Sequence, residues 1–267
     1  MQALGLDALG PLRNLVGESA DEVTQRLVAH QRAAIEAVTT DPARHHGVAA
    51  QVLVAPGLAT RAVPAAALAA DADLVVVGAK GESPLRRYLI GSTASHLLRK
   101  SRCPVLVVKR AAKQAYRRAL VPVDFSPGSE SALRLVGELA PHAQLVLLHS
   151  FHVPFEGMLN YAGVSQDVIH RYRADAKDKA QRELLALAQR AGLAPDQFVP
   201  LVEHGDAVAH ILEREAHAQA DLVVMGKHGT HVTEELLLGS VTQRVLAESH
   251  SDVLVVVDKR GPGNGAG

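Results

Sequence analysis

Two segments of the chain share a spacing of glycine and serine residues that suits the binding of phosphate. The first segment contributes four residues to this pattern: Gly78, Gly81, Gly91 and Ser92. The second has the same residue types 148 positions later: Gly226, Gly229, Gly239 and Ser240. Glycine has no Cβ atom and tolerates positive φ, so the backbone N–H groups beside it can surround an anion. A helix starting at the serine would add unpaired N–H groups and a hydroxyl, or the serine would only cap that helix.

The chain around these loops predicts strands that would hold them in place. The stretches 73–108 and 221–256 are identical at 15 of 36 aligned positions. Each begins and ends with a short apolar run, such as Asp73–Val77 and Val105–Val108 in the first stretch. Runs this short and rich in valine are typical of strands buried on both faces of a parallel sheet. The repeat therefore predicts two copies of half a nucleotide site, although two ordinary strand-to-helix turns would also fit.

The pattern Gly-x2-Gly-x9-Gly-Ser, ahead of a helix and a valine-rich strand, resembles the ATP-binding signature of the universal stress protein family. Residues Arg118–Ser126 resemble the opening strand of that family and its Asp-x-Ser turn. A predicted helix (Ser129–Leu139) and a second strand (Leu145–Ser150) follow. The resemblance covers nearly the whole chain and implies a doubly wound, open parallel α/β fold, present as two tandem repeats. The nucleotide would lie at the carboxyl ends of the strands, where the strand order reverses.

The resemblance assigns a complete ATP site to the second repeat. The residues that it implies as ATP-binding are Pro122, Val123, Asp124, Ser150, Met225, Gly226, Gly229, Gly239, Ser240, Val241 and Thr242. Asp124 would accept hydrogen bonds from the nucleotide and could help to hold a Mg²⁺ ion beside the phosphates. Ser150 would form part of the adenine slot. The Asp-x-Ser turn could instead serve only to cap the following helix.

The first repeat departs from the family pattern at its beginning. A shift of 148 positions places the counterpart of Arg118 before Met1, so the opening strand, first helix and second strand have no counterpart. We therefore expect a first repeat over residues 1–112, a complete second repeat over 113–260 and a flexible tail over 261–267. A start codon assigned too late would give the same pattern. The strands left in the first repeat would be Ala49–Val54, Leu74–Val77 and Val105–Val108.

The first repeat keeps its phosphate loop without the strand that would supply the floor of an adenine pocket. Its loop residues would then form a vestigial phosphate site, or would have a purely structural role: Gly78, Gly81, Gly91 and Ser92. ATP is therefore expected chiefly in the second repeat.

The last strand of each repeat would be an exposed edge if the two repeats did not meet. Val105–Val108 and Val253–Val256 are apolar, and unpaired edges of this kind pair readily with other chains. In the family such strands pair across a twofold axis, which implies an intramolecular pseudo-dimer here. A homodimer of the whole chain stays open, and the sequence identifies no partner protein.

Composition argues against several classes of partner and location. The 28 basic residues balance 28 acidic ones, so no overall charge would attract nucleic acid or an anionic membrane. No apolar run reaches the ~20 residues that cross a membrane, and Met1–Gly10 lacks the pattern of a secretion signal. The single cysteine, Cys103, fits a reducing compartment. We expect a cytoplasmic protein.

The sequence predicts neither a catalytic residue nor a metal site. It lacks the Gly-x4-Gly-Lys-Ser/Thr loop, the Gly-x-Ser-x-Gly elbow and the Gly-x-Gly-x-x-Gly fingerprint. Its 14 histidines show no ligand spacing such as His-x3-His on a helix. Three functions remain: an ATP-binding regulatory or interaction module of the stress response, a scaffold that binds no nucleotide, and a slow ATP hydrolase. We favour the first.

Overall fold

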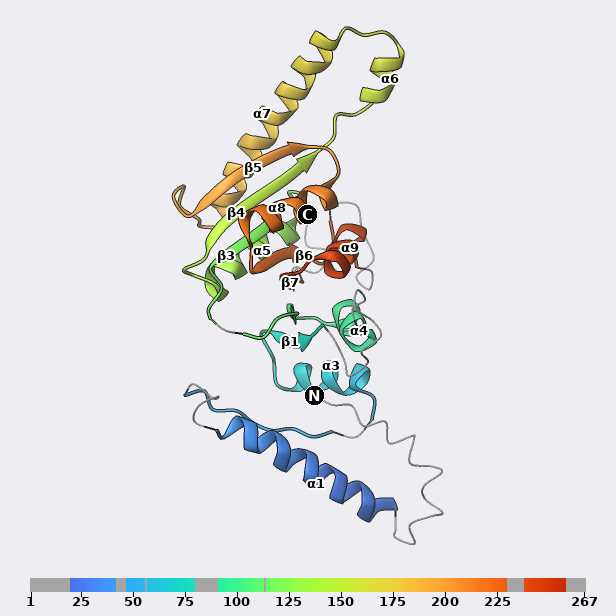
Figure 1. Cartoon of the computed structure of the whole chain (residues 1–267), viewed down its shortest axis with the longest axis vertical. Coiled ribbons are helices and arrows are strands. Elements are labelled where there is room, and N and C mark those ends of the chain that lie inside the picture. The colour runs from blue at the N-terminus through green and yellow to red at the C-terminus, as the bar shows by residue number, and fades with distance from the viewer. Residues whose placement is uncertain are drawn as a thin grey trace, which may run out of the picture. The chain divides into compact units, whose positions relative to one another are not determined.

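The computed structural model of the chain (Figure 1) describes residues 20–41, 47–55, 57–79, 91–112, 114–229 and 238–257. The chain divides into two compact units, residues 1–69 and 70–267. The first unit contains α1 (Ala20–Thr39) and α3 (Ala59–Ala69), and the second contains a seven-stranded sheet. None of the helices in the described ranges is both long enough and apolar enough to cross a membrane.

The described part of the segment between the two helices of the first unit forms no strand. Residues 48–55 have no regular secondary structure, so the strand expected at Ala49–Val54 is wrong. The side chain of Leu53 is 61% exposed, and Arg32 of α1 donates from Nη1 to the carbonyl oxygen of Val52 at 3.2 Å. A strand needs a neighbour that satisfies its backbone groups. The described part of this unit contains no such neighbour.

The second unit is built on one sheet with the strand order β1-β2-β7-β6-β3-β4-β5. Its strands are β1 (Val75–Gly78), β2 (Val105–Val108), β3 (Arg118–Pro122), β4 (Gln144–Phe151), β5 (Phe198–His204), β6 (Leu222–Gly226) and β7 (Asp252–Val256). Neighbouring strands run parallel except β2 and β7, which run antiparallel. This confirms the expected doubly wound sheet, in which β3, the opening strand of the second repeat, is central to that repeat.

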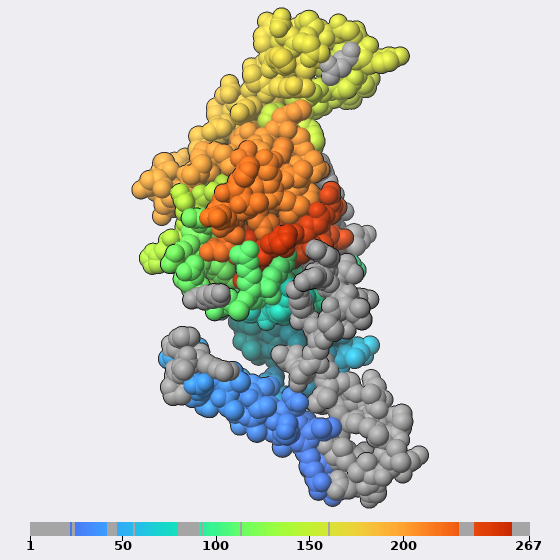
Figure 2. Space-filling view, in the orientation of Figure 1, coloured from blue at the N-terminus to red at the C-terminus, as the bar shows by residue number. Residues whose placement is uncertain are grey.

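Helices cover both faces of this sheet. The described helices of the second unit are α4 (Ser92–Lys100), α5 (Pro127–Leu139), α6 (Glu156–Tyr161), α7 (Gln166–Arg190), α8 (Ala207–Ala218) and α9 (Ser240–Glu248). α5 and α7 pack on one face of the second repeat, and α8 and α9 pack on the other. Figure 2 shows α8 (orange) next to α9 (red) on the face turned to the viewer. α6 and the first half of α7 extend past the sheet as a helical hairpin (Figure 1).

The central strands are buried on both faces, as their uninterrupted apolar runs predict. Leu120 and Val121 of β3 point to opposite faces of the sheet, and both are 0% exposed. Burying one such side chain stabilises the fold by roughly 1.5–3 kcal/mol. β1 differs, because Val76 is 57% exposed, and the prediction of burial on both faces is wrong there. The reason is its place at the edge of the sheet, where β2 is its one partner among the described strands.

The two repeats meet at β2 and β7. Val105 lies opposite Val255, and Val107 lies opposite Val253 in an antiparallel register. All four side chains are at most 1% exposed. The intramolecular pseudo-dimer predicted from the two valine-rich edges is therefore confirmed, and each edge shields the other from water.

Partly buried polar contacts join the two repeats next to the pairing of β2 with β7. Asp252 accepts hydrogen bonds from the backbone N–H of Lys109 at 2.7 Å and from the hydroxyl of Tyr116 at 2.8 Å. Burial and the hydrogen bond to Asp252 raise the pKa of Tyr116. The Lys109 ammonium donates to the carbonyl oxygens of Leu246 and Ser249 at the C-terminal end of α9, and burial lowers its pKa to about 8. A cation at this end also offsets the helix dipole.

Candidate functional site

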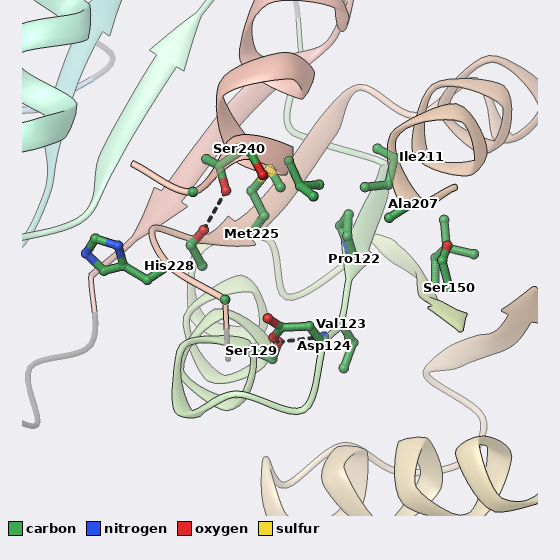
Figure 3. A pocket seen from close by; sticks show the side chains of 16 residues that line it. Pro122, Val123, Asp124, Ser129, Ser150, Ala207, Ile211, Met225, His228 and Ser240 are labelled. Carbon is green, nitrogen blue, oxygen red and sulfur yellow. Dashed lines mark hydrogen bonds between the residues drawn. The ribbon is translucent and has the colours of Figure 1, made fainter. Parts of the chain in front are cut away.

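A pocket of about 270 Å³ opens at the carboxyl ends of β3, β4 and β6 (Figure 3). β3 pairs with β4 on one side and with β6 on the other, so the chain connections diverge at this point of the sheet. Open α/β sheets bind ligands at such switch points. The pocket is lined by Pro122, Val123, Asp124, Ser129, Leu148, Ser150, Ala207, Ile211, Met225, Gly226, His228, Gly229, Gly239, Ser240, Val241 and Thr242.

Asp124 forms one wall of the pocket and is held by the start of α5. Its Oδ1 accepts hydrogen bonds from the backbone N–H of Ser126 at 3.1 Å, from the Ser126 hydroxyl at 2.6 Å and from the Ser129 hydroxyl at 2.7 Å. Ser126 is the N-cap of α5 and accepts from the backbone N–H of Ser129. The turn therefore caps the helix, and the same contacts fix the carboxylate at the pocket wall. The two interpretations of the Asp-x-Ser turn are compatible.

Lack of space explains two of the glycines of the second loop, Gly226 and Gly229. A Cβ atom on Gly229 would lie 2.7 Å from Oδ2 of Asp124, a distance at which one of the two must shift. A Cβ atom on Gly226 would lie 3.3 Å from the carbonyl carbon of Gly128 at the start of α5. Positive φ is absent from the described loop glycines Gly226, Gly229 and Gly239. The tolerance of glycine for positive φ is therefore not used at these three positions, whereas the lack of space applies at Gly226 and Gly229.

The two halves of the loop come together at the start of α9. The N–H of Gly239 donates to the carbonyl oxygen of Lys227 at 3.0 Å, and the Thr242 hydroxyl donates to the carbonyl oxygen of Gly226 at 3.0 Å. Gly239 is the N-cap of α9, so Ser240 begins the helix and does not cap it. N–H groups in the first turn of a helix lack partners within the helix and favour an anion. This end of the pocket therefore suits phosphate groups.

The opposite end of the pocket is mostly apolar. Figure 3 shows Ser150, Ala207 and Ile211 on the side away from His228 and Ser240. Ala207 and Ile211 are one turn apart on α8, and α8 packs over β3 and β4. An apolar slot with few polar groups is the usual setting for the ring system of a ligand. The pocket thus combines an anion-binding end with an apolar end.

Two stretches of the chain, residues 9–109 and 115–257, match the model of the universal stress protein family. The chain belongs to the universal stress protein family. A universal stress protein of Mycobacterium tuberculosis is 31% identical over 195 residues, covering 69% of this chain and 62% of the relative. One of Mycolicibacterium smegmatis is 33% identical over 193 residues, covering 70% and 62%. The matched region therefore spans less than two thirds of these mycobacterial relatives.

Solved structures agree on the fold. A crystal structure of a putative universal stress protein from Pseudomonas aeruginosa aligns with a TM-score of 0.60 and 21% identity. The alignment covers 85% of this chain and 78% of the other. At this level of identity the likeness concerns the fold alone.

The pocket of this universal stress protein contains every residue that the sequence predicted for ATP in the second repeat. They are Pro122, Val123, Asp124, Ser150, Met225, Gly226, Gly229, Gly239, Ser240, Val241 and Thr242. The lining residues outside that prediction are Ser129, Leu148, Ala207, Ile211 and His228. Leu148 lies two positions before Ser150 on β4, so the period of a strand places both on one face. The other four lack a comparable signal, except that His228 lies within the loop motif.

In the first universal stress protein repeat, the described ends of the loop have the same backbone contact as in the second. The N–H of Gly91 donates to the carbonyl oxygen of Ala79 at 3.1 Å, as Gly239 does to Lys227. Gly91 has φ −56° and ψ 148°, and Gly239 has φ −56° and ψ 145°. At Gly91 and Gly239 the shift of 148 positions therefore holds for backbone conformation as well as for residue type.

Among the described residues, the first repeat has no counterpart of the adenine end of the pocket in the second repeat. Gly78 ends β1, and Gly91 precedes α4, as the sequence predicted. Gly81 and the side chain of Ser92 lie outside what the structure describes. No described strand takes the position beside β1 that β3 takes beside β6. A vestigial phosphate site at these residues stays a proposal.

Outside the pocket, a polar cluster joins α6, α7 and β5. Oε2 of Glu156 lies 2.8 Å from Nε2 of His204, and Oε1 accepts a hydrogen bond from Nε of Arg173 at 2.9 Å. The hydrogen bond from Arg173 holds the pKa of Glu156 below its usual range. In the described part of the chain, no group of three or more His, Cys, Asp or Glu side chains could hold a metal ion.

Proposed function

We propose that this universal stress protein binds ATP in its second repeat and acts as a regulatory or interaction module whose state follows nucleotide occupancy. The observation that carries the proposal is the pocket at the switch point between β3 and β6. It joins the bare backbone of Gly226–Gly229 and the start of α9 to an apolar slot under α8. The first part would take the triphosphate and the second the adenine ring.

Asp124 and the loop would divide the recognition of the nucleotide between them. Asp124 would accept hydrogen bonds from the nucleoside, and its position is already set by the hydroxyls of Ser126 and Ser129. Among the described residues that line the pocket, Asp124 is the one carboxylate. Mg²⁺ entering with the triphosphate would therefore take at most one carboxylate ligand from this wall, with phosphate oxygens and water as the others.

Binding without turnover fits the site better than hydrolysis. A residue that activates water must reach it with a free acceptor. Oδ1 of Asp124 accepts three hydrogen bonds from Ser126 and Ser129, and Oδ2, which faces Gly229, is the oxygen that the proposal assigns to the nucleoside rather than to water. We therefore propose a cytoplasmic binding protein, with slow ATP hydrolysis and a scaffold without nucleotide as the alternatives. The repeats would comprise residues 1–112 and 113–260, with a tail over 261–267, and a homodimer of the whole chain is a further possibility.

The test is a matched pair of valine substitutions. A Cβ atom on Gly239 would meet its nearest neighbour, the carbonyl oxygen of Lys227, at 3.5 Å, which is ordinary contact. The backbone of Gly239 also has the extended ψ that valine favours. Gly239→Val should therefore fold normally and yet fill the space of a phosphate. Gly91→Val makes the same change in the first repeat.

Calorimetry with ATP on protein freed of nucleotide gives the readout. We expect one ATP per chain, loss of binding in Gly239→Val and little change in Gly91→Val. Loss of binding in Gly91→Val alone would place the site in the first repeat. Absence of binding in the unmodified protein would favour the scaffold, and steady release of phosphate that Gly239→Val abolishes would favour the hydrolase.

A further inference from the structure

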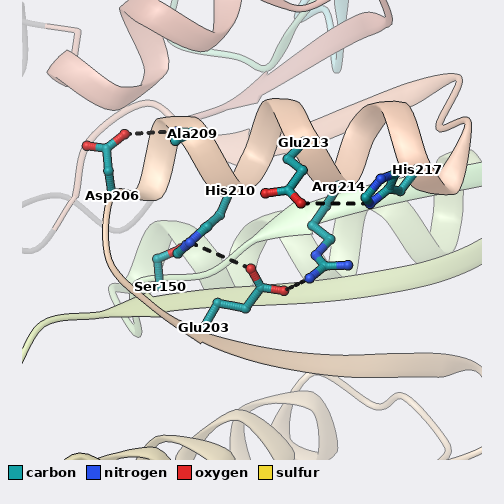
Figure 4. A network of polar contacts seen from close by, with 8 residues as sticks. All are labelled: Ser150, Glu203, Asp206, Ala209, His210, Glu213, Arg214 and His217. Carbon is teal, nitrogen blue, oxygen red and sulfur yellow. Dashed lines mark hydrogen bonds and ion pairs between the residues drawn. The ribbon is translucent and has the colours of Figure 1, made fainter.

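The hydroxyl of Ser150 lies between the apolar end of the pocket and a partly buried histidine, His210. Ser150 lies near the end of β4 and lines the pocket. Its Oγ is 3.2 Å from Nδ1 of His210, which belongs to the first turns of α8 (Figure 4). His210 does not line this pocket and borders a groove on the other side, along β5. The direction of this hydrogen bond determines what Ser150 offers to a ligand.

The surroundings of the ring determine that direction. Nε2 of His210 lies 3.7 Å from Oε2 of Glu203 on β5, and Oε1 of Glu203 is paired with Arg214. At this distance the negative charge of Glu203 favours an N–H on the ring nitrogen that faces it, so a neutral His210 carries its hydrogen on Nε2. Nδ1 is then an acceptor, and the Ser150 hydroxyl donates to it. The lone pairs of Ser150 Oγ remain for the pocket.

The turn at Gly205 packs closely against the imidazole ring of His210. Gly205 precedes α8 with a φ of +127°, and a Cβ atom there would lie 3.3 Å from Cε1 and 3.7 Å from Nε2 of His210. Its N–H donates to the carbonyl oxygen of Phe151 at 3.0 Å, which ties the turn to the end of β4. The imidazole is therefore confined between this turn, Glu203 and Ser150.

We propose that His210 is a positioning residue that makes Ser150 a hydrogen-bond acceptor at the base end of the pocket. The site would then favour a purine that carries an amino group on carbon 6 over one that carries a keto oxygen there. An amino group donates to Ser150 Oγ, whereas a keto oxygen would face its lone pairs. This inference rests on the proposed binding of ATP and adds its selectivity for the base.

The experiment compares ATP with inosine triphosphate, which differs in having a keto group at carbon 6. Calorimetry on the unmodified protein should show ATP binding roughly tenfold more tightly, the worth of about one hydrogen bond. Ser150→Ala should bring the two affinities to within about twofold. His210→Phe keeps a ring of similar shape but removes the acceptor, so the Ser150 hydroxyl becomes free to donate and the preference should also be lost.

The control is His217→Phe, which makes the same exchange at an exposed position of α8 and should leave the ratio unchanged. Thermal melting identifies any variant that does not fold, and Ser150→Ala removes only one atom. An unchanged ratio in both Ser150→Ala and His210→Phe, with ATP still bound, would overturn this inference alone. Failure of the unmodified protein to bind either nucleotide would overturn the proposed function, and this inference with it.

Discussion

Replacing Gly229 by alanine should damage the pocket wall even before a ligand is present. The added Cβ atom would lie 2.7 Å from Oδ2 of Asp124. The carboxylate is not free to turn away, because its Oδ1 accepts three hydrogen bonds from Ser126 and Ser129. Relief of the clash therefore requires either a shift of the loop backbone or the loss of at least one of these hydrogen bonds.

The size of the effect follows from these two routes. Forcing a methyl group into filled space costs ~1–3 kcal/mol, and a hydrogen bond to a charged group contributes ~1.5–3 kcal/mol. The protein will take whichever change needs less free energy, the backbone shift or the lost hydrogen bond. We therefore expect the free energy of unfolding to fall by about 2 kcal/mol. The affinity for ATP should fall at least tenfold, since about 1.4 kcal/mol corresponds to a factor of ten. The reason is that the same carboxylate would bind the nucleotide.

Urea unfolding followed by circular dichroism measures the first effect, and calorimetry with ATP measures the second. Gly137→Ala is a matched control, because a Cβ atom on Gly137 would meet nothing within 4 Å. It lies within α5, where alanine should raise stability by up to ~1 kcal/mol. If Gly229→Ala unfolded at the same urea concentration as the unmodified protein and bound ATP equally well, the steric argument for this glycine would be wrong.

Three further predictions concern stability. Glu215 is 6% exposed and accepts hydrogen bonds from the backbone N–H groups of His250 and Ser251. Glu215→Ala would leave these N–H groups without that acceptor and should lower the free energy of unfolding, measured by urea titration, by roughly 3 kcal/mol. Burial lowers the pKa of Lys109 from 10.5 to about 8, so between these pH values the unfolded chain binds a proton that the folded chain lacks. The unmodified protein should therefore gain stability relative to Lys109→Met as the pH rises from 8 to 10.5 in thermal melts. Val107→Thr places a hydroxyl in the joint between β2 and β7 and should cost ~1–2 kcal/mol, measured as faster proteolysis between the repeats.

Each of these predictions has a result that would contradict it. Glu215→Ala with an unchanged urea midpoint would mean that water replaces the carboxylate at no cost. Parallel pH profiles of the unmodified protein and Lys109→Met would show that Lys109 is well solvated. Val76→Thr is the control for Val107→Thr, because Val76 is 57% exposed and its exchange should stay within about 0.5 kcal/mol. Equal proteolysis of the two variants would count against the pseudo-dimer joint.

Much of the pocket could be predicted because its residues belong to motifs that end parallel strands. Pro122–Asp124 and Gly226–Gly229 are about one hundred positions apart, but the carboxyl ends of β3 and β6 meet at the same edge of the sheet. The joint of β2 with β7 was predictable for a related reason, since two apolar edges lose water when they pair. In both cases a short sequence motif was enough to predict which other segment lies next to it.

The apolar end of the pocket was not predictable in the same way. Ala207 and Ile211 lie on α8, whose sequence carries no binding motif. Their places depend on how α8 crosses β3 and β4, and that crossing results from packing over the whole layer. The strand expected at Ala49–Val54 failed for a similar reason, because an apolar run forms a strand only beside another strand.

The sequence by itself determined the two repeats, their register of 148 positions and the residues of the second loop, because residue type and spacing carry that information. Only the tertiary structure decided what these residues touch. Gly229 is needed because Asp124 lies against it, and Lys227, within the same motif, turns out of the pocket to donate to the carbonyl oxygen of Arg99 at 2.7 Å. Both contacts join segments about one hundred or more positions apart. Local patterns do not encode such contacts, because they arise when the whole layer of strands and helices packs together.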